Sequence, residues 1–233
     1  KEEPLPENLV SDVNNLYSEL IEYVAESDDS LLEKYFEKGN LSEEEMRGGI
    51  HQAIQNQIFI PMFCVSSELN IGVARFCDFI SKYGSSPDDR KTVKAINNKD
   101  EDIEISLDGN NTVIQIFKTM SESHIGELSL FRVYSGMVKT GDDLFNTNRN
   151  NSERMGQLFI LNGKNRTQVD SISAGDIGAV VKLKDTHTGN TLCSSDGVKL
   201  PKLKLPNSNI HSAISSTSKG EEEKLAIGLS TLH

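Results

Sequence analysis

Ser66 and Ser67 are the first pair of residues whose types and spacing could support chemistry. They follow the apolar run at 58–65 and precede a stretch with helical spacing of apolar residues from Gly72. A serine nucleophile requires a neighbouring general base, and in the Gly-x-Ser-x-Gly arrangement a sharp turn exposes its oxygen. Neither feature accompanies these serines in the sequence. The residue pattern therefore predicts no nucleophilic catalysis at this loop.

The sequence contains no phosphate-binding loop. Such a loop requires Gly-x-x-x-x-Gly-Lys-Ser/Thr, so that backbone N–H groups surround the phosphates and the hydroxyl holds magnesium. The tripeptide "GKN" at 163–165 lies between two β-type runs, which predicts a hairpin turn. The tripeptide "NKD" at 98–100 is superficially similar to the guanine-specificity motif Asn-Lys-x-Asp, but its aspartate comes one position early. We therefore interpret this match as coincidence.

The sequence does not indicate metal binding or acid–base catalysis. The histidines have no helical i, i+4 partner, and the cysteines have no close metal-ligand spacing. Acidic pairs fall on expected helix surfaces or in turns, which is a weak basis for proton transfer. Cys64 and Cys77 lie in apolar stretches, so we expect both thiols to be reduced and packed. We therefore predict no catalytic residues, no metal ligands and a cytoplasmic location.

The negative charge of the chain is concentrated in its first third. The net charge is −11 at pH 7, and residues 1–90 hold 18 acidic against 7 basic residues. Residues 91–205 hold 14 acidic against 15 basic residues, so this segment is close to neutral. A polyanionic partner is therefore not excluded for the middle of the chain.

The first third of the chain has the pattern of successive helices. Apolar residues recur at helical spacing over 9–25, and Asp28 or Ser27 can cap a second helix that ends at Gly39. The Ser-x-x-Glu pattern at 42–45 is a capping box that predicts the start of a third helix. Local signals alone thus predict three helices in this region.

A strand and a fourth helix are expected next. The apolar run at 58–64 predicts a buried strand, and 84–90 carries turn-forming residues that end this α/β portion. Between them, 72–83 predicts a helix whose inward face would carry Val73, Phe76, Cys77 and Ile80.

From about residue 91 the pattern changes to short β-type runs separated by glycine-containing turns. Several short strands without intervening helices favour a small antiparallel barrel or sandwich. The expected strands are 112–118, 126–136, 142–146, 154–161 and 176–183, with 202–206 as a last strand leaving the barrel. The segment "KGEEEKLAIGLSTL" then begins a helix that we expect to be cut short by the chain end.

Several blocks of the sequence resemble bacterial elongation factor G, a translational GTPase. They include "LLEKYFEKGNLSEEEMRGGIHQAIQNQIFIPMFCVSSELNIGV", "FRVYSGMVKTGDDLFN" and "RMGQLFILNGKNRTQVDSISAGDIGAVVKLKDTHTGNTLC". The resemblance covers most of the chain and implies an α+β multidomain fragment. Residues 1–88 would form the C-terminal part of the GTPase domain with its helical insertion. Residues 89–205 would form the domain II β-barrel, and 206–233 the truncated start of a ferredoxin-like domain III.

The resemblance extends to a nucleotide motif. "CVSSELNIGV" is similar to the fifth nucleotide motif of this family, which implies that Ser66 and Ser67 hydrogen-bond to guanine. The phosphate loop, the magnesium-binding switches and Asn-Lys-x-Asp would lie before Lys1, so GTP and magnesium are expected for the full-length protein and no cofactor for this fragment. Because phosphates and magnesium supply most of the binding and all of the chemistry, we expect the chain alone neither to bind nor to hydrolyse GTP.

The resemblance also implies a ribosomal partner. In this family the middle domain contacts small-subunit ribosomal RNA while tRNA and mRNA move on the ribosome. The candidate contact residues, which lie near turns or strand ends, are Arg132, Arg154, Lys164 and Arg166. Ordinary solvated charges remain the alternative for each of them, because phosphate contacts have no spacing signature.

Two other functions stay open at this point. Glu68, Leu69 and Ile71 replace a family pattern that carries two lysines beside the base site, which suggests a ribosome-binding paralogue with weak or dispensable GTP hydrolysis. A barrel that binds a small ligand or another protein is a third possibility, although the turns supply no convergent polar groups for one.

Overall fold

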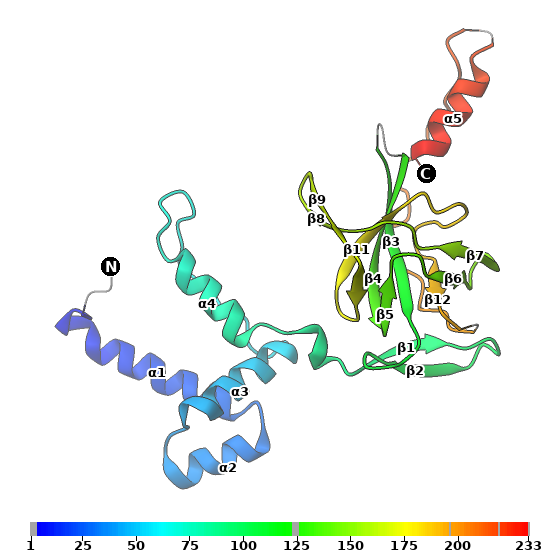
Figure 1. Ribbon diagram of the computed structural model, residues 1–233. Helices are drawn as coiled ribbons and strands as arrows, with labels where there is room; N and C mark the ends of the chain where they lie inside the picture. Colours follow the sequence, from blue (N-terminus) through cyan, green and yellow to red (C-terminus); the bar gives the residue numbers. More distant parts are fainter. Residues whose placement is uncertain (1–3, 123–125, 196, 219, 233) are drawn as a thin grey trace. The chain divides into compact units, whose positions relative to one another are not determined.

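The computed structural model describes residues 4–122, 126–195, 197–218 and 220–232, and the chain divides into two compact units (Figure 1). The first unit spans Lys1–Ser86 and the second spans Pro87–His233. Each unit has a hydrophobic core of its own. Among the described residues, no helix combines the length and hydropathy needed to cross a membrane.

The first unit is helical, as predicted for most of its length. A short 3-10 turn, η1 (Glu7–Leu9), leads into α1 (Val10–Ala25). Three further helices follow, namely α2 (Asp29–Lys38), α3 (Glu43–Gln55) and α4 (Val73–Tyr83).

Local side-chain caps set the boundaries of α2. Asp28 begins the helix by accepting hydrogen bonds from the backbone N–H groups of Ser30 and Leu31. The Ser30 hydroxyl, followed by these N–H groups, lowers the pKa of Asp28 from its usual value. Gly39 ends the helix in the left-handed region with a φ of 69°, which other residues adopt only with strain. The predicted cap and stop of this helix are therefore both confirmed.

Glu45 makes the start of α3 sensitive to acid. Its carboxylate accepts a hydrogen bond from the Ser42 N–H at 2.9 Å and lies 3.0 Å from Lys34 Nζ. The Ser42 N–H, then Lys34 and the Ser42 hydroxyl, lower the pKa of Glu45 from 4.5 to about 2. Because folding favours the ionised form, this contribution to stability is present above pH 4.5 and is lost as the pH falls toward about 2.

We expect Glu45→Gln to flatten the loss of helix content between pH 4.5 and about 2, as measured by circular dichroism during acid titration. The exposed neighbour Glu44 supplies the control, because Glu44→Gln removes a carboxylate outside the capping box. An identical acid transition in the wild type and in Glu45→Gln would contradict this role.

The apolar run at 58–64 does not form the predicted buried strand. No strand is assigned there, and Ile60 and Met62 are 85% and 94% exposed. A strand needs a neighbouring strand to pair its backbone N–H and C=O groups. Among the described residues of this unit, the only β-type pairing is the isolated bridge between Ser66 and Ile71. The apolar sequence is therefore present without the partner that would bury it.

The inward face of α4 also differs from the prediction. Phe76 and Ile80 are exposed, whereas Phe79 and Tyr83 pack against the helical core. An edge-to-face contact of 4.7 Å between the rings of Phe63 and Phe79 holds this orientation.

The two thiols of this unit were expected to be packed, and that prediction is wrong. Cys77 on α4 and Cys64 in the preceding segment are both exposed, whereas Cys193 in the second unit is buried. Cys77 shares the exposed face of α4, and Cys64 lies in the unpaired apolar segment, so neither gains a packing neighbour on both sides.

The second unit is built from short strands after a 3-10 turn, η2 (Pro87–Asp89). The strands are β1 (Thr92–Ile96), β2 (Asp102–Ser106), β3 (Val113–Glu122), β4 (Gly126–Ser135), β5 (Met137–Lys139), β6 (Asp143–Asn146), β7 (Asn151–Arg154), β8 (Leu158–Asn162), β9 (Asn165–Val169), β10 (Ser171–Ser173), β11 (Ile177–Val181) and β12 (Thr191–Cys193). A final helix, α5 (Glu222–Leu232), forms where the sequence predicted one.

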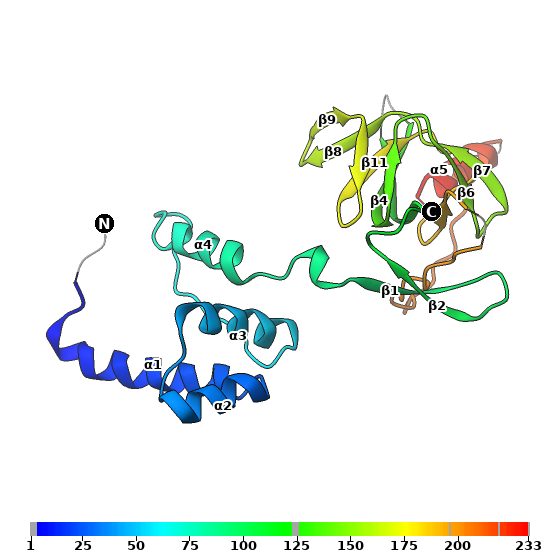
Figure 2. The same cartoon turned by 60° about the horizontal axis from the view of Figure 1, so that its bottom comes forward.

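Eight of these strands form one antiparallel sheet in the order β7-β6-β12-β3-β4-β11-β8-β9 (Figure 2). Two further antiparallel ladders pair β1 with β2 and β5 with β10. The longest ladder joins β3 to β4 and places Ile116 opposite Phe131. The sheet wraps around a core whose fully buried members include Ile114, Ile116, Phe131, Val133, Leu144, Leu158 and Leu192.

The antiparallel arrangement is confirmed, but a closed barrel is not found. The end strands β7 and β9 are not paired with each other in the described residues. The short β5–β10 ladder instead contributes Val138 and Ile172 to the core that the sheet surrounds. Side-chain packing therefore completes the core where backbone pairing does not.

Two strand predictions need correction in detail. The run at 154–161 is two strands, because β7 ends at Arg154 and β8 begins only at Leu158. The run at 202–206 is not a strand in the structure. Pro201 and Pro206 flank it, and a proline cannot donate to a strand ladder.

Candidate nucleic-acid interface

The Ser66–Ser67 loop is a tight turn before α4. The N–H groups of Ser66 and Ile71 donate to each other's carbonyl oxygens at 3.0 and 2.9 Å. The Leu69 N–H donates to the Ser66 hydroxyl at 3.3 Å. The Ser66 N–H is therefore used inside the turn, whereas Ser67 is exposed.

Gly72 lets this turn close on the preceding segment. Its φ is 75°, and a Cβ at this position would lie 3.2 Å from the Cys64 carbonyl oxygen. The turn offers hydroxyl groups of the kind that fit the edge of a guanine base. It supplies no cationic group for phosphates, and the part of the chain that the structure describes contains no cluster of three or more potential metal ligands.

Arg132 lies in the middle of the large sheet, on β4. Its register partners are Gln115 on β3 and Ile177 on β11. The guanidinium carbon lies 5.4 Å from the centroid of the Tyr134 ring, which is a cation–π arrangement. The Arg132 Nε is buried and has no hydrogen-bond partner among the described residues. Since buried N–H groups are nearly always paired, Arg132 is a donor with unused hydrogen-bonding capacity.

The other predicted contact residues lie at the two ends of the sheet order. Arg154 is on β7, where it is exposed and its Nη1 lies 3.9 Å from Asp143 Oδ2. Lys164 lies in the two-residue turn between β8 and β9, and Arg166 follows on β9 opposite Leu161. The hairpin predicted at 163–165 is thus confirmed. The structure brings Lys164 and Arg166 together, but it does not gather all four predicted residues into one site.

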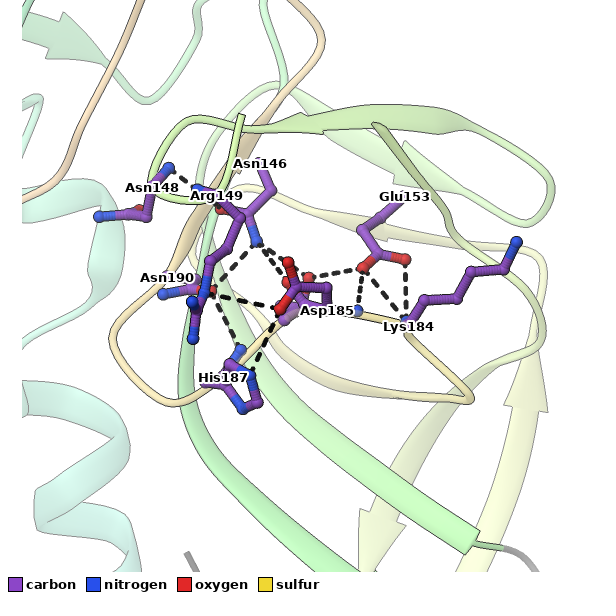
Figure 3. Close-up of polar contacts among 9 residues, drawn as sticks. Asn146, Asn148, Arg149, Glu153, Lys184, Asp185, His187 and Asn190 are labelled. Carbon is purple, nitrogen blue, oxygen red and sulfur yellow. Dashed lines mark hydrogen bonds and ion pairs between the residues drawn. The ribbon is translucent and has the colours of Figure 1, made fainter. Parts of the chain in front are cut away.

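A buried carboxylate organises the loop after β11 (Figure 3). Glu153 on β7 is 2% exposed, and its Oε1 accepts from the Asp185 N–H at 2.7 Å and from the Thr186 hydroxyl at 3.1 Å. The Lys184 N–H lies 3.1 and 3.0 Å from the two carboxylate oxygens. This carboxylate is therefore fully used in holding one loop against the sheet.

Asn146, which is fully buried at the end of β6, extends the same network. Its amide donates to Thr186 Oγ1 at 3.0 Å and to Asn190 Oδ1 at 3.1 Å, and its own oxygen accepts from the N–H groups of Asn148 and Arg149. Asn190 Oδ1 also accepts from the His187 N–H at 3.0 Å. One asparagine thus joins two loops that lie about forty residues apart in the sequence.

Three ionisable side chains project from this network into solvent. Asp185 Oδ1 lies 3.6 Å from Arg149 Nε and 3.5 Å from His187 Nε2, and all three side chains are about half exposed. Exposed pairs of this kind contribute little to stability. The arrangement has no nucleophile and no positioned acid–base pair, so the network serves to position two loops.

Sequence reasoning missed Glu153 and Asn146 as organising residues. The available signal was weak: Glu153 alternates with Met155, which places both side chains on the same, inward side of the chain. The partners of both residues come from a distant loop, and no local pattern identifies them.

The curled antiparallel sheet with its rigid loops defines a domain of the type carried by translation factors. Residues 111–195 match the family model described as Elongation factor G domain 2. The chain is 34% identical over 230 residues to Elongation factor G of Neorickettsia sennetsu (strain ATCC VR-367 / Miyayama), an alignment that covers 98% of this chain and 33% of that protein. A crystal structure of a protein from Thermus thermophilus matches with a TM-score of 0.82 at 25% identity, over 100% of this chain and 33% of that one.

Residues 111–195 therefore belong to the elongation factor G domain 2 family, and the chain is elongation factor G-like over nearly its whole length. It spans about a third of the length of the curated relative and of the solved structure that it matches.

Proposed function

We propose that this chain is the central part of a translation factor that promotes movement of tRNA and mRNA on the ribosome. In this proposal it works in the cytoplasm, and the second unit contacts small-subunit ribosomal RNA and relays the nucleotide state of a longer protein. GTP and magnesium would bind mainly outside these 233 residues, with Ser66 and Ser67 touching the guanine base.

The observation that carries the proposal is the 34% identity to Elongation factor G along 98% of the chain. The geometry supports the RNA contact in two places. Lys164 and Arg166 lie on one hairpin, and Arg132 holds an unpaired buried Nε beside Tyr134. Cationic side chains of this kind neutralise phosphates and release counterions, which makes binding depend on salt.

A ribosome pelleting assay tests this function. We expect the chain to sediment with ribosomes at low salt and to be displaced by unlabelled elongation factor G. The triple variant Arg154→Gln, Lys164→Gln and Arg166→Gln should bind about tenfold more weakly, and its dependence on salt should fall by about 2 to 3 phosphate contacts.

The matched control removes the same charge elsewhere. Lys38, Lys82 and Lys99 are exposed lysines outside the predicted contact set, and their replacement by glutamine should change binding less than about twofold. Equal weakening by both triple variants would contradict the assigned contact residues. No sedimentation with ribosomes at any salt concentration would contradict the proposed function itself.

A further inference from the structure

A groove on the second unit is lined by cations and by no carboxylate. Its volume is about 560 Å³, and it runs between β1 and the segment at 200–204. The residues that matter most are Arg90, Lys94, Lys202 and Lys204, with Gln115 and Tyr134 between them. All four cations are exposed, whereas Gln115 is buried.

Hydrogen bonds fix the two sides of this groove relative to each other. Ile96 on β1 and Lys199 exchange backbone hydrogen bonds of 2.8 Å in both directions. The buried Gln115 side chain donates from Nε2 to the Pro201 carbonyl oxygen at 2.9 Å. The Leu200 N–H donates to the Thr191 hydroxyl at 3.0 Å. The groove is therefore preorganised, so a ligand would not have to order these backbone segments on binding.

The charge of the groove is opposite to that of the whole chain. The chain carries a net charge of −11, yet four cations and no acidic residue line this surface. The nearest acidic position in register is Glu104, which faces Lys94 across the β1–β2 ladder but does not line the groove. Within the described residues, no ion pair neutralises these four cations. Their charges are available to an external anion.

We propose that this groove binds single-stranded RNA, independently of the ribosomal contacts assigned to Arg154, Lys164 and Arg166. Lysine and arginine on both sides would neutralise successive phosphates, and the Tyr134 ring would stack on a base. Arg132, 5.4 Å from the centroid of that ring, supports its orientation. An open groove with exposed cations on two sides suits a strand that passes through it, whereas a small anion is usually enclosed.

Fluorescence anisotropy with a dye-labelled uridine oligonucleotide tests this site without ribosomes. The full chain should bind the oligonucleotide with a Kd between about 1 and 100 μM near physiological salt. The triple variant Lys94→Gln, Lys202→Gln and Lys204→Gln should bind at least about tenfold more weakly, and the slope of log affinity against log salt should fall by about 2. The substituted lysines are exposed, so the fold should be retained.

The aromatic contribution is tested separately at Tyr134. Tyr134→Leu should weaken binding about fivefold to tenfold, whereas Tyr134→Phe keeps the stacking surface and should stay within about twofold. The control triple variant at Lys38, Lys82 and Lys99 should also stay within about twofold.

Three outcomes would overturn the proposal. The first is equal weakening by the groove variant and the control variant. The second is full competition by ATP or pyrophosphate at the oligonucleotide's own concentration, which would show a small-anion site. The third is unchanged affinity in Tyr134→Leu. Ribosome sedimentation is measured independently, so failure of this site and failure of the proposed translation function are distinguishable.

Discussion

Replacing Glu153 with alanine is expected to lower the free energy of unfolding of the second unit by about 3 kcal/mol. The substitution removes the acceptor for the N–H groups of Lys184 and Asp185 and for the Thr186 hydroxyl. Glu153 is 2% exposed, so water cannot readily replace the lost carboxylate without opening the loop. Hydrogen bonds to a charged acceptor are among the stronger ones, and donors left without a partner in a buried site are costly.

The measurement is amide hydrogen exchange followed by mass spectrometry, which reports on each unit separately. Peptides that contain β6, β7 and the 182–190 loop should lose protection in Glu153→Ala, while α1 to α4 should not change. Glu153→Gln is the matched control, because it keeps one acceptor oxygen and should cost only about 1 kcal/mol. Equal protection in the wild type and Glu153→Ala would show that the network does not stabilise this loop.

Replacing Gly178 with valine is expected to destabilise the second unit by about 3 kcal/mol. Gly178 lies in β11, and its φ is not in the left-handed region, so strand propensity alone predicts that valine would be favourable there. Tertiary packing predicts the opposite. A Cβ at this position would overlap Ile172 Cδ1 and lie 3.0 Å from Phe131 Cζ, and both neighbours are buried.

A double-mutant cycle makes this prediction specific. Ile172→Ala in the Gly178→Val background creates room, so the two substitutions together should cost at least about 1 kcal/mol less than the sum of their separate effects. Urea denaturation of the four proteins supplies the required free energies. A neutral or stabilising Gly178→Val would show that the core around Ile172 and Phe131 is looser than the structure describes.

Local signals were sufficient wherever a structure is closed within a few residues. The caps at Asp28 and at 42–45 and the helix stop at Gly39 could be predicted, because each depends on side chains that reach the backbone of the same turn. The hairpin at 163–165 was predicted for the same reason. The resemblance of long blocks of sequence to elongation factor G, confirmed over 98% of the chain, could also be seen without coordinates.

The candidate sites could be predicted only in part. Arg132 was identified from its place in the sequence, but its unpaired Nε and its position beside Tyr134 follow from the packing of three strands. Arg154 and Lys164 are both basic residues near turns, yet the sheet order separates them. No local pattern could place the lysines at 202 and 204 beside β1, since the hydrogen bonds of Gln115 and Ile96 bring them there.

The sequence by itself determined the helices of the first unit, the succession of strands in the second, and the family. Periodicity and capping are encoded between neighbours a few residues apart, and long blocks of similarity carry the fold with them. Only the tertiary structure decided which apolar runs are paired and which charges converge. The run at 58–64 is exposed and the groove is cationic because pairing, burial and local charge depend on partners that are distant in the chain.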